Sequence, residues 1–369
     1  MATRPSSARS ERRTGTRPAT AAHPPMRDFA GGSSFVVEWD VRPVFDFMFS
    51  LSPEAGSSED LPAEDRRWLK AAKAALPPEI RAESKALAHT ELAIHVASFA
   101  VGHPEARTVA DFLVALESAP LLDLMLAIVG DFGVGSNGEA IARAAVAGDL
   151  AALTALTADV SDHDGGLLDL MTDPERTRER ILAVLKAWAV PFAEIEDRMA
   201  AIGRRDFEMR GVDRATMSSL DLIERTTGGV RWLPTTGVRR VILGPSYFSR
   251  PYNFLLGGDG WRFFGYPVAD EALDLGDPLA PPSSVLRLHR ALGDPTRMRI
   301  LKLLADRDLY ATEIAQQLEL SKPTIKHHLV LLRAAGLVTI TESGAVVYYS
   351  LRRDRLDDAS IELKRFLGA

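Results

Sequence analysis

The chain has 369 residues, of which 46% are hydrophobic and 25% are charged, and its formal net charge is −6. This composition is that of ordinary globular proteins, so it excludes wholesale disorder and fibrous repeats, and the length predicts roughly two or three domains. The sequence contains no cysteine, which excludes disulfides, thiolate zinc sites and cysteine nucleophiles within these residues.

The charge is distributed unevenly along the chain. Residues 1–34 hold six arginines against two acidic residues, and residues 283–369 hold 14 Lys and Arg against 10 Asp and Glu. The part between them carries the excess negative charge. An acidic body with two cationic ends predicts that any polyanion is bound by the ends.

Residues 1–34 are rich in Arg, Ser, Thr, Ala and Pro and hold hardly any large apolar residue. They cannot pack a core, so we expect a disordered tail. Three interpretations stay open: an inert segment preceding a later start at Met26, an arm that contacts phosphate, and a targeting segment.

Residues 35–276 are predicted to form an acidic, helical sensor or assembly domain. Apolar residues recur at spacings of three and four as far as about Thr227, which is the period of amphipathic helices. Asp173 before Pro174 predicts a capped helix that Pro191 kinks or ends. The longest apolar run, Leu121 to Val129, is far too short for a transmembrane helix, so no membrane contact is expected.

Residues 230–268 show a different pattern, in which β-branched and aromatic residues alternate with glycine-rich turns, and three short strands are expected there. The aromatic side chains either form the packed face of a sheet or line a pocket for a flat apolar ligand. These aromatic residues are Trp232, Tyr247, Phe248, Tyr252, Phe254, Trp261, Phe263, Phe264 and Tyr266.

Residues 277–284 are predicted to be a stiff, proline-rich linker at a domain boundary. The domain that follows, residues 285–369, begins with a short helix and a second helix capped by Asp294 and Pro295. Thr312 is expected to cap a third helix, and Ser321 caps a fourth that Gly336 ends. Two short helices joined by a tight turn predict a helix-turn-helix.

The fourth helix carries the residues expected to read DNA, because the major groove admits one helix and offers base edges to its first turns. The candidates for this role are Lys322, Thr324, Lys326, His327 and His328. His328 has a structural alternative, because the helical phase places it near the core. Phosphate contacts are expected from Arg297, Arg299, Lys302, Lys322 and Arg333, or from the tail. Residues 337–351 predict a β-hairpin wing.

These motifs resemble the ArsR-type winged helix-turn-helix regulators. The resemblance is carried by the runs Ala291-Leu-Gly-Asp-Pro-Thr-Arg297, Leu320-Ser-Lys-Pro-Thr324 and Ala335-Gly-Leu-Val338. It implies a homodimer that binds an inverted-repeat operator, usually as a repressor, with the first and last helices of the domain at the dimer seam. The residues suited to that seam are Leu288, Leu356, Leu363, Phe366 and Leu367.

The sequence departs from the metal-sensing members of that family. They place cysteines in the third helix, or histidines and carboxylates in the last one, whereas here the third-helix region reads Asp308-Leu-Tyr-Ala-Thr312. Asp354, Asp357 and Asp358 have no histidine beside them. We therefore expect no metal sensing and no cofactor.

Two other motifs have a functional and a structural interpretation. Residues 133–138 match G-x-G-x-x-G, but no strand and helix alternation follows, so a glycine-rich helix connection is favoured over a dinucleotide site. Asp162-His163-Asp164, or Glu91 with His95, could supply metal ligands, yet a solvated turn is the simpler interpretation. No catalytic constellation is found, and the chain is not expected to be an enzyme.

Taken together, the sequence predicts a mainly α fold with small β elements. A helical N-terminal domain carries a short aromatic-rich sheet, and a winged helix-turn-helix follows it. The expected function is that of a cytoplasmic, sequence-specific DNA-binding repressor that acts as a homodimer on double-stranded operator DNA, with a small-molecule effector in the N-terminal domain. The alternative is an enzyme or nucleotide-binding domain that a winged helix tethers to DNA.

Overall fold

The computed structural model describes residues 35–52, 55, 60–88, 92–130, 137–158, 165–234, 236–273, 281–343 and 346–368. Residues 35–369 form one compact unit. The tail predicted over residues 1–34 lies outside the described residues, as do residues 277–280 of the predicted linker.

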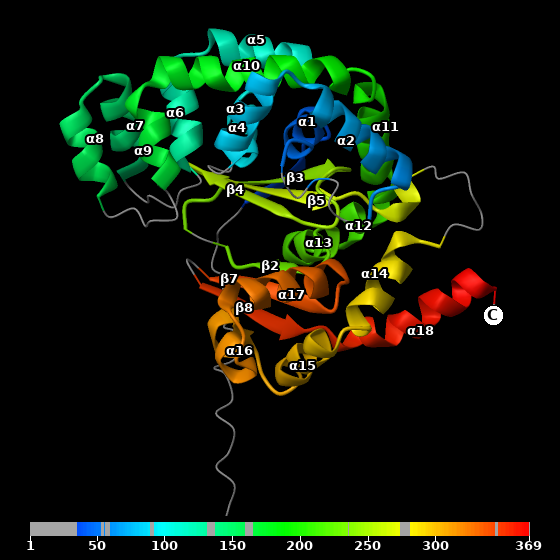
Figure 1. The fold of residues 1–369 in the computed structure, drawn as a ribbon. Coiled ribbons are helices and arrows are strands. Elements are labelled where there is room, and N and C mark those ends of the chain that lie inside the picture. Colours follow the sequence, from blue (N-terminus) through cyan, green and yellow to red (C-terminus); the bar gives the residue numbers. More distant parts are fainter. Residues whose placement is uncertain are drawn as a thin grey trace, which may run out of the picture. The chain divides into compact units, whose positions relative to one another are not determined.

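The part before the linker is mainly helical, as its apolar spacing predicts (Figure 1). Its helices are α1 (Val44–Phe49), α2 (Ala63–Ala75), α3 (Pro78–Ala88), α4 (Leu92–Gly102), α5 (Val109–Ser118), α6 (Leu121–Gly130), α7 (Gly138–Val146), α8 (Leu150–Thr157), α9 (Gly165–Thr172), α10 (Pro174–Phe192), α11 (Glu196–Met209), α12 (Gly211–Thr216) and α13 (Ser219–Thr226).

Side-chain caps explain where several of these helices begin. Asp173 accepts a hydrogen bond from the backbone N–H of Arg176 at 3.1 Å and Pro174 follows it, so the predicted start of α10 is confirmed. Pro191 lies in the last turn of α10, which ends one residue later. Thr108 forms a capping box with Asp111 at the start of α5.

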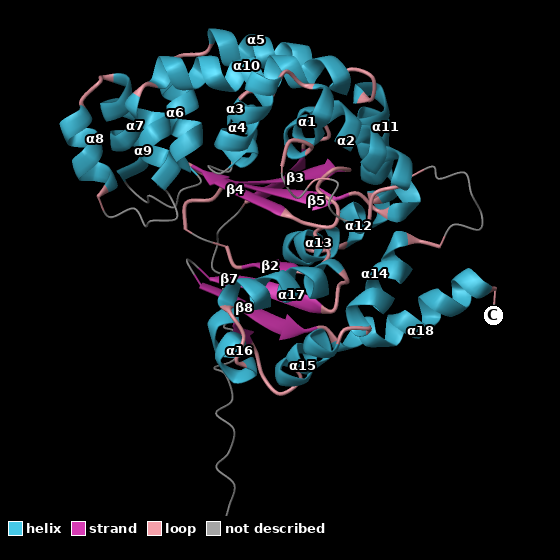
Figure 2. Ribbon diagram, viewed as in Figure 1, coloured by secondary structure: helices cyan, strands magenta, loops and turns pink. Residues whose placement is uncertain are grey.

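The first sheet has the strand order β1-β3-β5-β4, and Figure 2 labels β3, β4 and β5 among its strands. Its strands are β1 (Val36–Trp39), β3 (Arg240–Ser246), β4 (Phe254–Gly258) and β5 (Trp261–Pro267). β1 and β5 run parallel to β3, and β4 is antiparallel to β5. β1 lies at the start of the stretch that was predicted to be mostly helical, and no strand was predicted there.

This sheet separates two hydrophobic cores, because successive side chains of a strand point to opposite faces. Ile242 and Phe263 join the core formed by the helices α1 to α11. Val241 and Phe264 face the other way and pack with Trp232 and with α13. The aromatic strands thus form packed faces, which favours the first of the two interpretations given for them.

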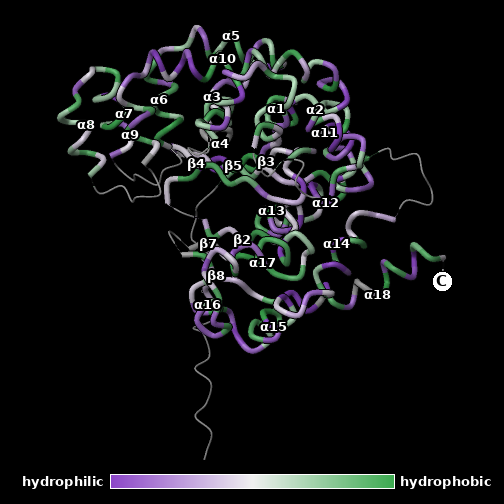
Figure 3. Tube along the Cα trace, in the orientation of Figure 1, coloured by the Kyte–Doolittle hydropathy of each residue, from purple (hydrophilic) through white to green (hydrophobic). Residues whose placement is uncertain are grey.

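The part after the linker contains the predicted winged helix-turn-helix elements. These are α14 (Ser283–Leu292), α15 (Pro295–Leu304), β6 (Leu309–Tyr310), α16 (Ala311–Leu318), α17 (Lys322–Ala334), β7 (Val338–Ser343), β8 (Val346–Leu351) and α18 (Arg353–Leu367). They enclose a separate core that includes Leu288, Ile300, Ile314 and Leu329. Along α18, apolar and polar residues alternate (Figure 3).

The two parts share a sheet, which the sequence did not predict. The short strand β2 (Val230–Trp232) lies before the linker and pairs in parallel with β7 of the wing. The strand order of this second sheet is β2-β7-β8-β6. Ile340 of β7 and Tyr349 of β8 pack against residues of the first part in one cluster. The winged helix is therefore joined to the N-terminal part by strand pairing as well as by the linker.

The helices of the described residues can be compared with the length and apolarity that a membrane span requires. No single helix there is long and apolar enough to cross a bilayer, and only α5 and α6 together, bent by 111° at their junction, reach that length and composition.

Candidate nucleic-acid interface

The helix-turn-helix consists of α16, a three-residue turn and α17. Glu319 ends α16 with a left-handed φ of 56°, a conformation that turns the chain sharply and that few non-glycine residues adopt. Ser321 then caps α17 by accepting a hydrogen bond from the backbone N–H of Thr324 at 3.3 Å, and Pro323 lies in the first turn. The predicted start of the fourth helix of this domain is confirmed.

One face of α17 is anchored and the other is open. Ile325, Leu329 and Leu332 are buried in the core of the winged helix. On the opposite side, the exposed residues of the first two turns include Lys322, Thr324, Lys326 and His327. A helix held in this way presents cations and hydrogen-bonding groups at its N-terminal half, where a major-groove reader makes base contacts.

Thr324 and His328 differ from the other candidates in their surroundings. The Thr324 hydroxyl lies 2.7 Å from the Ser321 hydroxyl, so one of its hydrogen bonds is already used in the cap. The His328 side chain is only 16% exposed and its Nδ1 lies 4.0 Å from Asp294. Burial lowers the pKa of His328, although the Asp294 carboxylate acts against this shift. These surroundings favour the structural interpretation of His328.

The arginine and lysine candidates on α15 divide into two kinds. Arg299 and Lys302 are exposed. The guanidinium of Arg297 instead donates to the carbonyl oxygens of Ala291 at 3.0 Å and Arg290 at 2.6 Å, at the end of α14. Because Arg297 already satisfies these helix-end carbonyls, we remove it from the expected phosphate contacts.

Arg333 also lies away from the open face of α17. It is partly buried at the end of the helix, beside Tyr349 and Tyr252, and burial lowers its pKa. It lines a cavity between the N-terminal part and the winged helix. The structure thus places this arginine apart from the exposed residues of α17.

The residues expected at a dimer seam are mostly on the surface of α18. Leu356, Phe366 and Leu367 are 39%, 36% and 65% exposed, and Leu363 is half-buried. Ile361, which the sequence reasoning did not select, is 54% exposed on the same helix. Leu288 is fully buried in the core of its own domain, so it has no surface to offer a partner.

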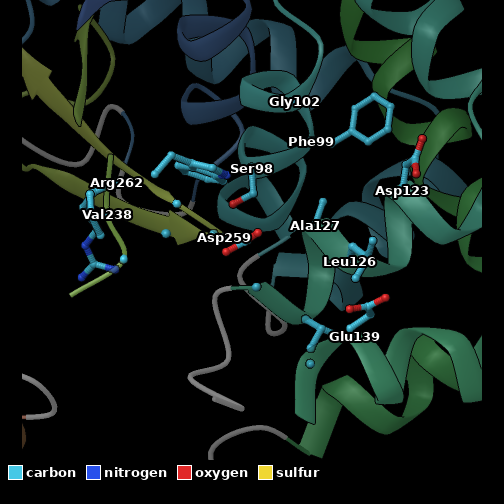
Figure 4. A pocket seen from close by; sticks show the side chains of 18 of the residues that line it. Ser98, Phe99, Gly102, Asp123, Leu126, Ala127, Glu139, Val238, Asp259 and Arg262 are labelled. Atoms are coloured by element: carbon cyan, nitrogen blue, oxygen red, sulfur yellow. The ribbon is translucent and has the colours of Figure 1, made fainter. Parts of the chain in front are cut away.

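A cavity of about 940 Å³ lies within the N-terminal part, between α4, α6 and the turn from β4 to β5. Ser98, Leu126 and Asp259 are among the residues that line it (Figure 4). Asp123 and Glu139 add two further carboxylates to its lining. Some buried polar side-chain atoms of the described residues lack a hydrogen-bond partner. None of these atoms belongs to a residue that lines this cavity.

Most residues of the other predicted motifs lie outside the described residues. Residues 133–136 of the glycine motif and the Asp162-His163-Asp164 cluster are not among the described residues, and the same is true of Glu91. Within the described ranges, no group of three His, Asp or Glu side chains is placed to hold a metal ion.

The capped helix pair, the β7-β8 hairpin and the supporting helices define a winged helix-turn-helix protein of the DNA-binding class. Residues 294–339 match the family described as "Bacterial regulatory protein, arsR family". The chain belongs to the ArsR family of bacterial regulatory proteins by virtue of this C-terminal region.

Three relatives illustrate the extent of the match. The transcriptional repressor SdpR of Bacillus subtilis (strain 168) is 41% identical over 81 residues, which are 22% of this chain and 90% of SdpR. The HTH-type transcriptional regulator CmtR of Mycobacterium tuberculosis (strain ATCC 25618 / H37Rv) is 43% identical over 81 residues, or 22% of this chain and 69% of CmtR. A cadmium resistance transcriptional regulatory protein CadC homolog of Staphylococcus aureus is 37% identical over 71 residues, or 19% of this chain and 59% of that protein.

Proposed function

We propose that the protein is a sequence-specific DNA-binding transcriptional regulator that represses by binding a double-stranded operator. The observation that carries this proposal is the orientation of α17, whose apolar side is anchored while Lys322, Lys326 and His327 are exposed on its first two turns. The names of the relatives, a transcriptional repressor and a transcriptional regulator, support the same function.

The proposed contacts divide into two sets. Thr324, Lys326 and His327 lie where base edges are read, because they face away from the core at the N-terminal half of α17. Lys322, with Arg299 and Lys302 of α15, supplies phosphate contacts that fix the register of the protein on the duplex.

The proposal includes a homodimer formed through α18. Ile361, Phe366 and Leu367 expose apolar surface near the end of that helix, and a second copy would bury it. Two copies related by a twofold axis would read half-sites separated by about one helical turn of DNA, roughly 34 Å. The proposal places the protein in the cytoplasm with its DNA, and the N-terminal part holds the effector.

Fluorescence anisotropy tests the function directly. The protein is titrated into a duplex taken from upstream of its own gene and, separately, into a scrambled duplex, each at low and high salt. We expect tight binding to the first duplex alone, weakened by salt because phosphate contacts release counterions. Equal, weak binding to both duplexes under both conditions would contradict a sequence-specific regulator that binds this site.

The variant Lys326→Ala tests the base-reading role of α17. We expect it to weaken binding to the operator by about 1–3 kcal/mol and to weaken binding to the scrambled duplex much less, because a base contact is sequence-dependent. Lys70→Ala, which removes an exposed lysine of α2, is the matched control and should change neither affinity. A uniform loss on both duplexes would identify Lys326 as a phosphate contact instead.

A further inference from the structure

A second cavity, of about 690 Å³, lies between the N-terminal part and the winged helix. Helices α11 and α13 and the segments that follow β3 and β5 line it from the first part. The first half of α14, the end of α17 and residues of α18 line it from the second. A ligand in this cavity would therefore touch both the N-terminal part and the recognition helix.

Two residues of this lining each carry a buried polar atom that has no hydrogen-bond partner among the described residues. These atoms are the hydroxyl oxygen of Thr226 and the side-chain carbonyl oxygen of Asn253. Thr226 is only 4% exposed, while the amide nitrogen of Asn253 is held by the carbonyl of Thr227 at 2.8 Å. Buried polar groups are normally paired, since an unpaired one is costly to remove from water.

Arg333 contributes a cation to a lining that also holds seven Asp and Glu side chains. Among the described residues no ion pair between Arg333 and a carboxylate is found, and the groups that act electrostatically on its guanidinium are the phenols of Tyr349 and Tyr252. Burial lowers the pKa of Arg333, which means that its charge is poorly solvated. An anion bound beside this guanidinium would stabilise its positive charge and offset the free-energy cost of its burial.

Several other arginines of the lining are already neutralised. Arg210 pairs with Asp206 at 2.8 Å, and Arg287 pairs with Asp60 at 2.7 Å. Arg355 is paired with Glu362. These ion pairs set the three arginines apart from Arg333, which is the cation of the lining that we assign to an anionic ligand.

We propose that this junction cavity binds a small molecule through an oxyanion, either a carboxylate or a phosphate, held by the guanidinium of Arg333. The planar guanidinium matches two oxyanion oxygens at once. The Thr226 hydroxyl donates a further hydrogen bond to the ligand. The Asn253 carbonyl oxygen accepts one, so the ligand also carries a hydroxyl or amino group. The inference deepens the proposed function, on which it rests for its effect on DNA binding.

The contacts around Arg287 connect this cavity to the recognition helix. The Arg287 side chain, on α14, donates to Asp60 of the N-terminal part and to the carbonyl oxygen of Ala334 at 3.2 Å. Ala334 ends α17 and lines the cavity next to Arg333. A ligand that binds more tightly to one position of this helix end would increase the fraction of molecules in that conformation. It would thereby change the fraction of molecules that can bind DNA.

Methionine methyl NMR of the full chain without DNA tests the site, because Met209 and Met217 line the cavity and Met298 of α15 does not. Inorganic phosphate and acetate are titrated in separate arms, with ionic strength held constant by sodium chloride. We expect saturable shifts of the Met209 and Met217 signals, with a dissociation constant in roughly the millimolar range for probes of so few atoms. The anion with the lower dissociation constant, phosphate or acetate, identifies the kind of oxyanion that the cavity prefers.

Two variants test the role of Arg333. Arg333→Gln should raise the dissociation constant of the anion by about tenfold or more, because it removes a charge-assisted hydrogen bond. Arg204→Gln, which removes an exposed arginine of α11 outside the cavity, should leave it unchanged. If Arg333→Gln fails to fold, Thr226→Val removes the unpartnered hydroxyl at almost constant size and should also weaken binding severalfold, because the ligand loses a hydrogen-bond donor.

The outcomes separate the site from the proposed function. Absence of saturable shifts with either anion, or equal affinity in Arg333→Gln and the unmodified protein, overturns the site. Loss of DNA sequence preference in the anisotropy assay with anion binding intact contradicts the proposed function alone. Retained DNA specificity without anion binding contradicts the site alone.

Discussion

At the scale of single residues, Asp46 of α1 shows how burial and hydrogen bonding compete. Its Oδ1 accepts hydrogen bonds from the Ser246 hydroxyl at 2.6 Å and from the backbone N–H of Phe248 at 2.9 Å. Burial nevertheless raises its pKa from 3.8 to about 6, because desolvation of the carboxylate outweighs these hydrogen bonds. The folded protein therefore holds this proton more tightly than the unfolded chain does.

This raised pKa predicts a pH dependence of the free energy of unfolding. Asp46 contributes stability that is fully present below its unfolded pKa and is lost as the pH rises through about 6. Asp46→Asn is neutral at every pH, so we expect it to gain about 2 kcal/mol relative to the unmodified protein between about pH 4.5 and pH 7. Urea unfolding at both pH values measures this difference.

The control for this measurement is Asp197→Asn, which changes an exposed carboxylate at the start of α11. Its stability relative to the unmodified protein should stay nearly constant over the same pH range. A relative loss of stability in Asp46→Asn as the pH rises would have the wrong sign and would contradict the raised pKa.

Single residues of the interface were predictable where local periodicity decides their exposure. The helical phase of α17 places Lys326 and His327 outside and Ile325 inside, and the structure agrees. The surroundings of Arg297 and Arg333 could not be predicted, because a charge in the sequence does not reveal its partner. The guanidinium of Arg297 binds carbonyls at the end of α14, and Arg333 faces tyrosines brought to it by the tertiary fold.

At the scale of elements, the cap of α15 is both visible in the sequence and important for the interface. Asp294 accepts a hydrogen bond from the backbone N–H of Arg297 at 2.8 Å, and that bond is the largest cause of its lowered pKa. Asp294→Ala should lower the free energy of unfolding by about 1 kcal/mol, the usual worth of such a cap. Urea unfolding at neutral pH measures the loss.

Asp294→Asn is the matched variant, because an asparagine side chain retains the capping oxygen. It should lose much less stability than Asp294→Ala. Equal losses in the two variants would show that the charge of Asp294, and not its hydrogen bond to the helix, accounts for the effect.

The elements that sequence reasoning missed are short strands with distant partners. β1 has four residues and β2 has three, and each pairs in parallel with a strand far along the chain. Helices and hairpins are encoded by neighbouring residues, so α10, α17 and the β7-β8 hairpin could be predicted. Parallel pairing depends on where the intervening helices place the strands, and no local period records that.

At the scale of the described unit, the shared sheet makes the N-terminal part and the winged helix one structure. Gly229 accepts a hydrogen bond from the backbone N–H of Ile340 at 3.2 Å, and Trp232 packs 5.0 Å from Phe35 and 6.2 Å from Phe264 between ring centroids. The core at this junction therefore holds side chains from both sides of the linker. We therefore expect the N-terminal part and the winged helix to unfold together.

Calorimetry of Trp232→Ala tests this cooperativity. The unmodified protein should unfold in one transition, and removal of this 5% exposed side chain should lower the melting temperature of that whole transition by about 5 °C, from a loss of roughly 3–5 kcal/mol. Val190→Ala, at a 75% exposed position of α10, is the control and should leave the transition in place. Two separate transitions, with the winged helix unaffected by Trp232→Ala, would contradict this expectation. They would mean that the N-terminal part and the winged helix unfold independently and that the pairing of β2 with β7 does not couple them.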